Sequence, residues 1–174
     1  MSQLPSTRRV LVTVGTDYHA FDRLIRWADR WSETNPEARV VVQHGASRPP
    51  LVAIAVPFLS PSELQDEMAA ADVVVTHGGP ATITEARRTG RTPVCVPRDP
   101  RLGEHVDDHQ QRFARFLAER GLVRLVETED EFFDSLSAVV EPGHEADVGQ
   151  LATPAGVEEV GRIVAQLIHD YRSS

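Results

Sequence analysis

The stretch DVVVTHGGPATITE, residues 72–85, indicates how this chain folds. It opens with a short β-branched run, residues 72–76, which is the composition of a fully buried strand. A His-Gly-Gly turn at residues 77–79 follows, and then Pro80. Residues 81–88 have the composition of a helix, and a proline fits the first helical position because its missing N–H has no partner there. The sequence therefore predicts a strand, a glycine turn and a helix in direct succession.

The predicted turn has the features of an anion site. Gly78 and Gly79 would let a phosphate approach the backbone closely, and the helix N-terminus would supply partial positive charge. Glu85 lies one helical turn further on, where its carboxylate can accept hydrogen bonds from a ribose diol. The stretch is thus typical of a nucleotide site. A Gly-Gly turn is also common between strands and helices, and the stretch matches neither a Walker A loop nor a GxGxxG fingerprint.

Length and composition narrow the class of protein. The 174 residues suit one domain with a sizeable core, and the formal net charge of −8 argues against a nucleic-acid partner. No apolar run approaches the roughly 20 residues of a membrane-spanning helix, and the N-terminus does not have the pattern of a signal peptide. The single Cys95 excludes an internal disulfide framework and fits a small core residue. These features predict a cytoplasmic protein.

Strand and helix patterns alternate along the chain. The β-branched runs predict strands at residues 9–14, 39–43, 51–58, 72–76, 92–97 and 122–126. Apolar periodicity and capping signals predict helices at residues 22–33, 61–71, 81–88, 108–120, 128–140 and 155–171. Residues 141–155 have the composition of a loose linker.

This alternation predicts the fold class. Strands that alternate with helices favour α/β architecture with one Rossmann-like, doubly wound parallel sheet of about six strands. Ligands bind such sheets at the carboxyl ends of the strands. Three of those ends carry a glycine beside a polar residue, at residues 15–16, 44–45 and 77–79, and we expect one crevice to gather them. The polar loop at residues 98–109 is longer than a connection requires.

Four segments together resemble a known family. They are VTVGT at 12–16, PFLSPSEL at 57–64 with MAAADVVVTHGG at 68–79, TITEARRTGRTPVCVPR at 82–98 and GEHVDDHQ at 103–110. In this order they resemble the glycosyltransferase family 28 C-terminal domain, the donor-binding half of a GT-B glycosyltransferase. They look most like small separate subunits: the catalytic subunit of the eukaryotic dolichol-linked N-acetylglucosamine transferase and bacterial exopolysaccharide glycosyltransferase subunits.

The resemblance implies a UDP-sugar site. Residues 1–174 would form one nucleotide-sugar-binding domain that ends in the helix 155–171. The loop at 15–16 and the turn at 77–82 would bracket the diphosphate, and the uracil would rest near residues 57–59. Where many relatives have a small polar residue this chain has Pro80-Ala81, so a hydroxyl contact to phosphate would fall to Thr82. The residues implied are Gly15, Thr16, His77, Gly78, Gly79 and Thr82 for the diphosphate, Glu85 for the ribose, and His109 and Gln110 for the sugar or its phosphate.

The resemblance also implies a partner. A complete GT-B enzyme has two such domains, with the acceptor site and usually the general base in the N-terminal half. This chain has one, so it is expected to be the donor-binding catalytic subunit of a two-component, metal-independent glycosyltransferase that needs no cofactor. It would transfer a hexose or N-acetylhexosamine to a polyprenyl-linked acceptor in polysaccharide or glycolipid synthesis. A membrane-associated subunit would bind that acceptor, provide the catalytic base and hold the chain at the inner membrane face.

Other interpretations stay open from sequence. The chain could be a non-catalytic nucleotide-sugar-binding or regulatory module. It could also be a small flavodoxin-like enzyme in which the acids and histidines of residues 104–109 bind a metal, although helix capping explains those acids as well. His77 could cap its own turn and Glu85 could be a solvated helix acid. His19 and His44 are interpreted as non-catalytic.

Overall fold

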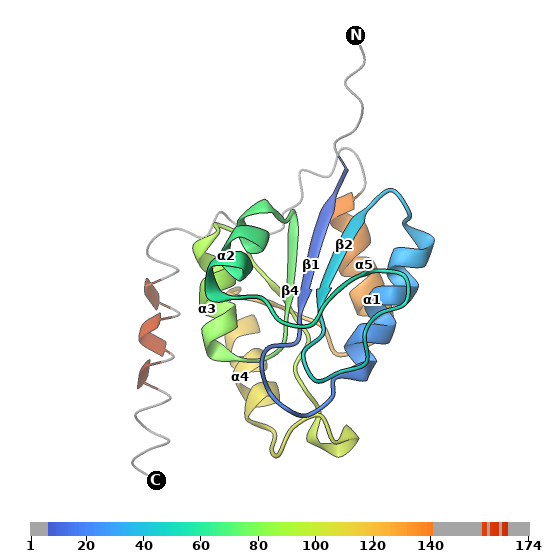
Figure 1. The fold of residues 1–174 in the computed structure, drawn as a ribbon. Coiled ribbons are helices and arrows are strands. Elements are labelled where there is room, and N and C mark those ends of the chain that lie inside the picture. Colours follow the sequence, from blue (N-terminus) through green and yellow to red (C-terminus); the bar gives the residue numbers. More distant parts are fainter. Residues whose placement is uncertain (1–6, 141–157, 160, 164, 167–174) are drawn as a thin grey trace.

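The computed structural model of this chain describes residues 7–140, 158–159, 161–163 and 165–166 (Figure 1). The described residues form one six-stranded sheet in the order β3-β2-β1-β4-β5-β6, with every neighbouring pair parallel. This confirms the predicted doubly wound α/β sheet. The strands are β1 (Arg9–Thr13), β2 (Arg39–Gln43), β3 (Ile54–Val56), β4 (Val73–Thr76), β5 (Val94–Cys95) and β6 (Arg124–Leu125).

Helices cover both faces of the sheet. In Figure 1, α1 and α5 lie on one side of the central strands, and α2, α3 and α4 lie on the other. Alternate residues of β1 explain this arrangement, because Val10 and Val12 pack in the cluster that contains α1 and α5 while Leu11 packs with α2 and α3. The helices are α1 (Asp22–Thr34), α2 (Pro61–Ala70), α3 (Pro80–Arg88), α4 (His109–Ala118) and α5 (Glu129–Val140), with a 3₁₀ turn η1 (Pro100–Leu102) before α4.

The helix starts follow the sequence signals. Ser60 and Glu63 form a reciprocal capping box at α2, in which each side chain accepts a hydrogen bond from the other residue's backbone N–H. Helix α3 begins at Pro80, as predicted, and Gly79 is its N-cap residue. Cys95 is fully buried, and burial raises the pKa of its thiol to about 12, which agrees with a core role rather than a nucleophilic one.

The outer strands are shorter than predicted. The third strand, expected at residues 51–58, is limited to β3 because Asp29 on α1 accepts hydrogen bonds from the backbone N–H groups of residues 51–53 at 2.7–3.1 Å. The fifth, expected at 92–97, narrows to β5 between Pro93 and Pro97, which have no N–H to donate. The sixth, expected at 122–126, narrows to β6, and the Leu122 N–H bonds Leu117 at the end of α4 instead.

The C-terminal segment is described only in part. Its described residues are helical, which agrees with the predicted helix at 155–171, and Ile163 packs against a cluster that includes Ile83 and Leu117. The linker predicted at residues 141–155 lies outside the described residues. Within the described ranges, no helix combines the length and the apolar character needed to cross a membrane.

Candidate functional site

A pocket of about 400 Å³ lies at the carboxyl ends of β1 and β4. These two strands are neighbours at the point where the strand order reverses, which is where open α/β sheets bind ligands. The volume is in the range of small-molecule sites. The lining residues are Thr13, Gly15, Thr16, Asp17, Gln43, Phe58, Leu59, Leu64, His77, Gly79, Pro80, Ala81, Thr82 and Gln110.

Six of the nine predicted site residues line this pocket and three do not. Glu85 lies on α3 one turn beyond Thr82 and is partly exposed. His109 is the first residue of α4, and its Nδ1 lies 2.7 Å from Asp107 Oδ1. The three outside the lining are Gly78, Glu85 and His109. The ligand contacts assigned to all nine stay predictions.

The residue that the second strand contributes to the pocket lining differs from the prediction. His44 and Gly45 are not among the lining residues, whereas Gln43 is. The Gln43 Nε2 donates to the carbonyl oxygens of Gly15 at 3.1 Å and Pro57 at 3.2 Å. Its Oε1 accepts from the Thr13 hydroxyl at 2.6 Å. The side-chain amide of this lining residue therefore connects the ends of β1, β2 and β3.

The His77 ring is held between two glycines. A Cβ at Gly15 would lie 2.4 Å from His77 Nε2, and a Cβ at Gly79 would lie 2.1 Å from its Cε1. Neither position can hold a side chain unless the ring moves. The close packing of His77 is therefore the first reason why residues 15 and 79 are glycines. The same contact brings the β1 loop and the turn after β4 together.

His77 also caps its turn, as one interpretation of the sequence allowed. The Gly79 N–H donates to Nδ1 at 3.1 Å, so the ring proton is on Nε2, which lies 3.3 Å from Thr82 Oγ1. Burial, together with the nearby charge of Arg98, lowers the pKa of His77 to about 4. His77 is thus neutral at pH 7 and presents an N–H toward Thr82.

The N-terminus of α3 leaves two backbone N–H groups for a ligand. The first four N–H groups of a helix have no partner within it. Here the Gly79 N–H bonds His77, and Pro80 has none. The remaining two belong to Ala81 and Thr82, and both residues line the pocket. The partial positive charge of the helix end and the Thr82 hydroxyl add to them, which makes this wall suited to a phosphate.

Gln110 fixes the start of α4 against the glycine turn. Its Oε1 accepts from the Gly78 N–H at 3.1 Å and from the Arg98 N–H at 3.4 Å. A Cβ at Gly78 would lie 2.6 Å from the Gln110 Cβ, so only glycine allows this approach. Gln110 is thus both a lining residue and a structural contact.

Arg98, which no sequence signal distinguishes from the other arginines, is fully buried, and its backbone N–H contacts the lining residue Gln110. Its guanidinium donates to the carbonyl oxygens of Val14 at 2.7 Å, His19 at 2.7 Å and Glu104 at 2.9 Å. It also lies over the Phe21 ring, 4.9 Å from the centroid. One side chain therefore joins the β1–α1 loop to the loop of residues 98–109.

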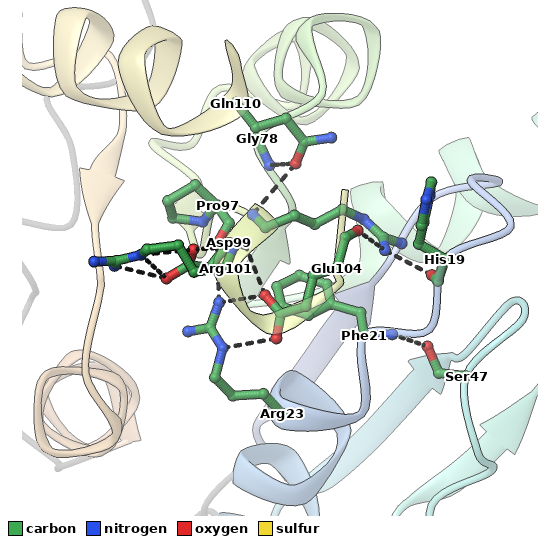
Figure 2. A network of polar contacts seen from close by, with 11 residues as sticks. His19, Phe21, Arg23, Ser47, Gly78, Pro97, Asp99, Arg101, Glu104 and Gln110 are labelled. Atoms are coloured by element: carbon green, nitrogen blue, oxygen red, sulfur yellow. Dashed lines mark hydrogen bonds and ion pairs between the residues drawn. The ribbon is translucent and has the colours of Figure 1, made fainter. Parts of the chain in front are cut away.

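The acids of that second loop have structural partners. Glu104 accepts a bidentate pair from Arg23 on α1 at 2.8 and 2.9 Å and also accepts the Asp99 N–H at 2.8 Å (Figure 2). Asp107 accepts the His109 N–H at 3.0 Å. In the part of the chain that the structure describes, no group of three or more His, Cys, Asp or Glu residues is arranged to hold a metal ion.

Two further features of the wall concern charge and polarity. Asp17 is a lining residue with a carboxylate, whose Oδ1 accepts from the backbone N–H of His19 at 2.7 Å and lies 2.6 Å from that ring's Nδ1. Phe58 and Leu59, at the place predicted for uracil, are apolar lining residues. That uracil contact stays a prediction.

Substitution of Gly15 by alanine is expected to weaken this arrangement. Gly15 has φ +77°, where an alanine is strained, and its new Cβ would displace His77. We expect a loss of about 2 kcal/mol in the free energy of unfolding, measured by urea denaturation. The matched control is Gly121→Ala, since Gly121 has φ +66° but nothing within 4 Å of its Cβ. Equal losses in the two variants would contradict a role for the His77 contact.

Comparisons with known proteins identify the family of this chain. The glycosyltransferase family 28 C-terminal domain matches residues 9–155. The UDP-N-acetylglucosamine--N-acetylmuramyl-(pentapeptide) pyrophosphoryl-undecaprenol N-acetylglucosamine transferase of Burkholderia mallei is 32% identical over 122 residues, which cover 63% of this chain and 30% of that protein. The protein of the same name from Burkholderia thailandensis is 31% identical over 122 residues. The match thus spans less than a third of the length of these relatives.

Solved structures share the fold. The calicheamicin glycosyltransferase CalG4 superposes with a TM-score of 0.58 at 17% identity, covering 97% of this chain and 40% of that one. MurG from Acinetobacter baumannii gives 0.55 at 19% identity, covering 80% and 43%. The sheet is therefore that of the C-terminal half of a GT-B glycosyltransferase. Because the family match extends over most of the sequence, this chain belongs to the glycosyltransferase family 28 C-terminal domain family.

Proposed function

We propose that this chain is the UDP-sugar-binding catalytic subunit of a two-component, metal-independent glycosyltransferase. It would transfer a hexose or N-acetylhexosamine from UDP to a lipid-linked acceptor. The observation that carries the proposal is the pocket wall at α3, where the N–H groups of Ala81 and Thr82 remain after His77 and Pro80 account for the other two. Family membership supports the same reaction class.

The wall at α3 suits the chemistry of the leaving group. When the bond between the sugar C1 and the diphosphate oxygen breaks, negative charge develops on the diphosphate, and fixed donors that point at this charge accelerate the step. In our proposal the helix end, the two amides, the Thr82 hydroxyl and the neighbouring loop of Gly15 and Thr16 hold the diphosphate. This arrangement stabilises the charge with groups that are already in place.

We assign the uracil, the ribose and the sugar of the donor to other residues in and near the pocket. In our proposal the uracil ring packs on the apolar side chains of Phe58 and Leu59, and Glu85, one turn along α3 from Thr82, binds the ribose. The sugar is assigned to the end of the pocket that Gln110 lines, with His109 beside it at the start of α4.

The acceptor and the partner are proposed from the relatives. The name of the Burkholderia transferases specifies a pyrophosphoryl-undecaprenol acceptor, a lipid. The match covers 30% of those proteins, and we assign the donor to the pocket of this chain. We infer that a membrane-associated subunit binds a polyprenyl-linked acceptor, supplies the general base and brings this chain to the membrane surface.

Calorimetric titration with UDP tests the donor site. The chain is expected to bind UDP. Thr82→Val, which removes the hydroxyl but keeps the shape, is expected to weaken binding by about tenfold to a hundredfold, because a hydrogen bond to a charged group contributes about 1.5–3 kcal/mol. Glu85→Gln tests the ribose contact in the same assay. Its control is Glu67→Gln, a half-buried helix acid on α2 outside the pocket lining.

The outcomes separate the two parts of the proposal. No UDP binding by the chain alone or with its co-expressed partner would reject the donor site. Full transfer to a polyprenyl-linked acceptor by the isolated chain would reject the need for a partner and leave the donor site in place.

A further inference from the structure

We propose that the Asp17 carboxylate accepts a hydrogen bond from a hydroxyl group of the donor sugar and thereby helps to select that sugar. This inference rests on the proposed function, since it places a UDP-sugar in the pocket. Asp17 is the one residue with a carboxylate among those that line the pocket. A carboxylate repels a diphosphate, so it belongs beside the uncharged part of the donor.

The two carboxylate oxygens of Asp17 differ in their partners. Oδ1 accepts the His19 backbone N–H at 2.7 Å and lies 2.6 Å from His19 Nδ1. Among the described residues, the nearest basic group to Oδ2 is His105 Nε2 at 3.8 Å, which is beyond hydrogen-bond distance. Within the described residues, Oδ2 therefore keeps its capacity to accept a hydrogen bond from a ligand.

The charge state of Asp17 suits a carboxylate that accepts a hydrogen bond from a sugar hydroxyl better than it suits a general base. Burial acts to raise the pKa of this carboxyl, but the hydrogen bonds from His19 and the charge of Arg98 outweigh it and lower the pKa. An efficient general base has a pKa near the operating pH, which Asp17 does not. An ionised carboxylate is instead an acceptor only, and a sugar hydroxyl offers the donor that it lacks.

The surroundings hold this carboxylate in place. His19 stacks on Tyr18 at 4.1 Å between ring centroids, and the His19 carbonyl accepts from the buried Arg98. His105 faces the same carboxylate from the loop of residues 98–109. A recognition group needs such support, because a shift of about 1 Å would remove the hydrogen bond.

A purely structural role is the alternative. The Oδ1 contact to the N–H two residues on is an Asx turn, which needs only one side-chain oxygen. Asparagine can make that turn equally well. Asp17→Asn therefore keeps the turn through its amide oxygen, and it places an NH₂ donor where Oδ2 stood.

The experiment compares UDP with UDP-N-acetylglucosamine, UDP-glucose and UDP-galactose by calorimetric titration of the chain. For the UDP-sugar that binds tightest relative to UDP, Asp17→Asn is expected to lower the ratio of its affinity to that of UDP about tenfold, the effect of one charge-assisted hydrogen bond. UDP itself should bind no more weakly, since a negative charge is removed. The control Asp22→Asn, whose carboxylate accepts from Arg48 outside the pocket lining, should leave both affinities unchanged.

The results distinguish this inference from the proposed function. A normal affinity for UDP with an unchanged ratio in Asp17→Asn would overturn the inference and leave the proposed function standing. Equal losses for UDP and the UDP-sugar would show that Asp17 only shapes the loop, which also overturns it. A wild-type chain that binds none of the four nucleotides, with or without its partner subunit, overturns both.

Discussion

Replacement of Arg98 by methionine is expected to lower the free energy of unfolding by about 3 kcal/mol or more. Methionine fills much of the space but donates no hydrogen bond, so three carbonyl oxygens lose a donor from the guanidinium. A buried polar group left without its partner costs about 1–3 kcal/mol. The contact between the guanidinium and the Phe21 ring is lost as well. Chemical denaturation of the two proteins at pH 7 measures the difference.

Two further variants make this prediction specific. Arg101→Met removes an arginine three residues away whose side chain is 82% exposed and pairs with Asp99, so its unfolding midpoint should stay close to that of the wild type. Arg98→Lys keeps the charge but lacks the planar fork that reaches three carbonyls, so it should fall between the wild type and Arg98→Met. If Arg98→Met were as stable as Arg101→Met, the two loops would not depend on this side chain.

Arg98 also affects the residues that line the proposed nucleotide pocket. Arg98 joins the loop that contains Gly15 and Asp17 to the loop that leads into Gln110. Its buried charge also lies close enough to lower the pKa of both His77 and Asp17. The position of the pocket walls and the charge around them therefore depend on one residue that does not line the pocket.

The central part of the fold could be predicted because its signals are local. The β-branched runs of β1, β2 and β4 are long enough to define strands, and each is paired on both sides. Pro80 and the Ser60–Glu63 capping box fix where two helices begin. The meeting of the β1 loop with the turn at residues 77–79 followed from the rule that parallel strands end at the same edge.

The parts that were missed depend on contacts between distant residues. Asp29 takes the N–H groups of residues 51–53, which lie 22–24 positions along the chain, so a run with strand composition forms no ladder there. Arg98 is one of several arginines in this part of the sequence, and its three carbonyl partners become visible only once the loops are folded together. Asp17 has no motif of its own, and only the pocket geometry singles it out.

Acidification is expected to destabilise this protein through His77 well before pH 4. The ordinary pKa of 6.5 applies to the unfolded chain, and the folded value is about 4 because the ring is buried beside Arg98. Between these values the unfolded state binds more protons than the folded state, so stability rises with pH and is lost as the pH falls from 6.5 toward 4. The loss from this one group reaches about 2 kcal/mol at pH 5 and about 3 kcal/mol near pH 4.

Comparison with His77→Asn isolates this contribution. The asparagine Oδ1 occupies much the same place as the histidine Nδ1 and can still accept the Gly79 N–H, but the side chain does not titrate. Other groups with a lowered pKa, such as Asp17 and Glu131, are present in both proteins and cancel in the difference. The unfolding free energies of the wild type and His77→Asn, measured from pH 7.5 to pH 5, should therefore converge as the pH falls. Only the wild type loses stability from keeping a buried histidine neutral. Parallel curves would show that the folded protein accommodates a protonated His77, and the ring could then serve as a charged contact to the diphosphate.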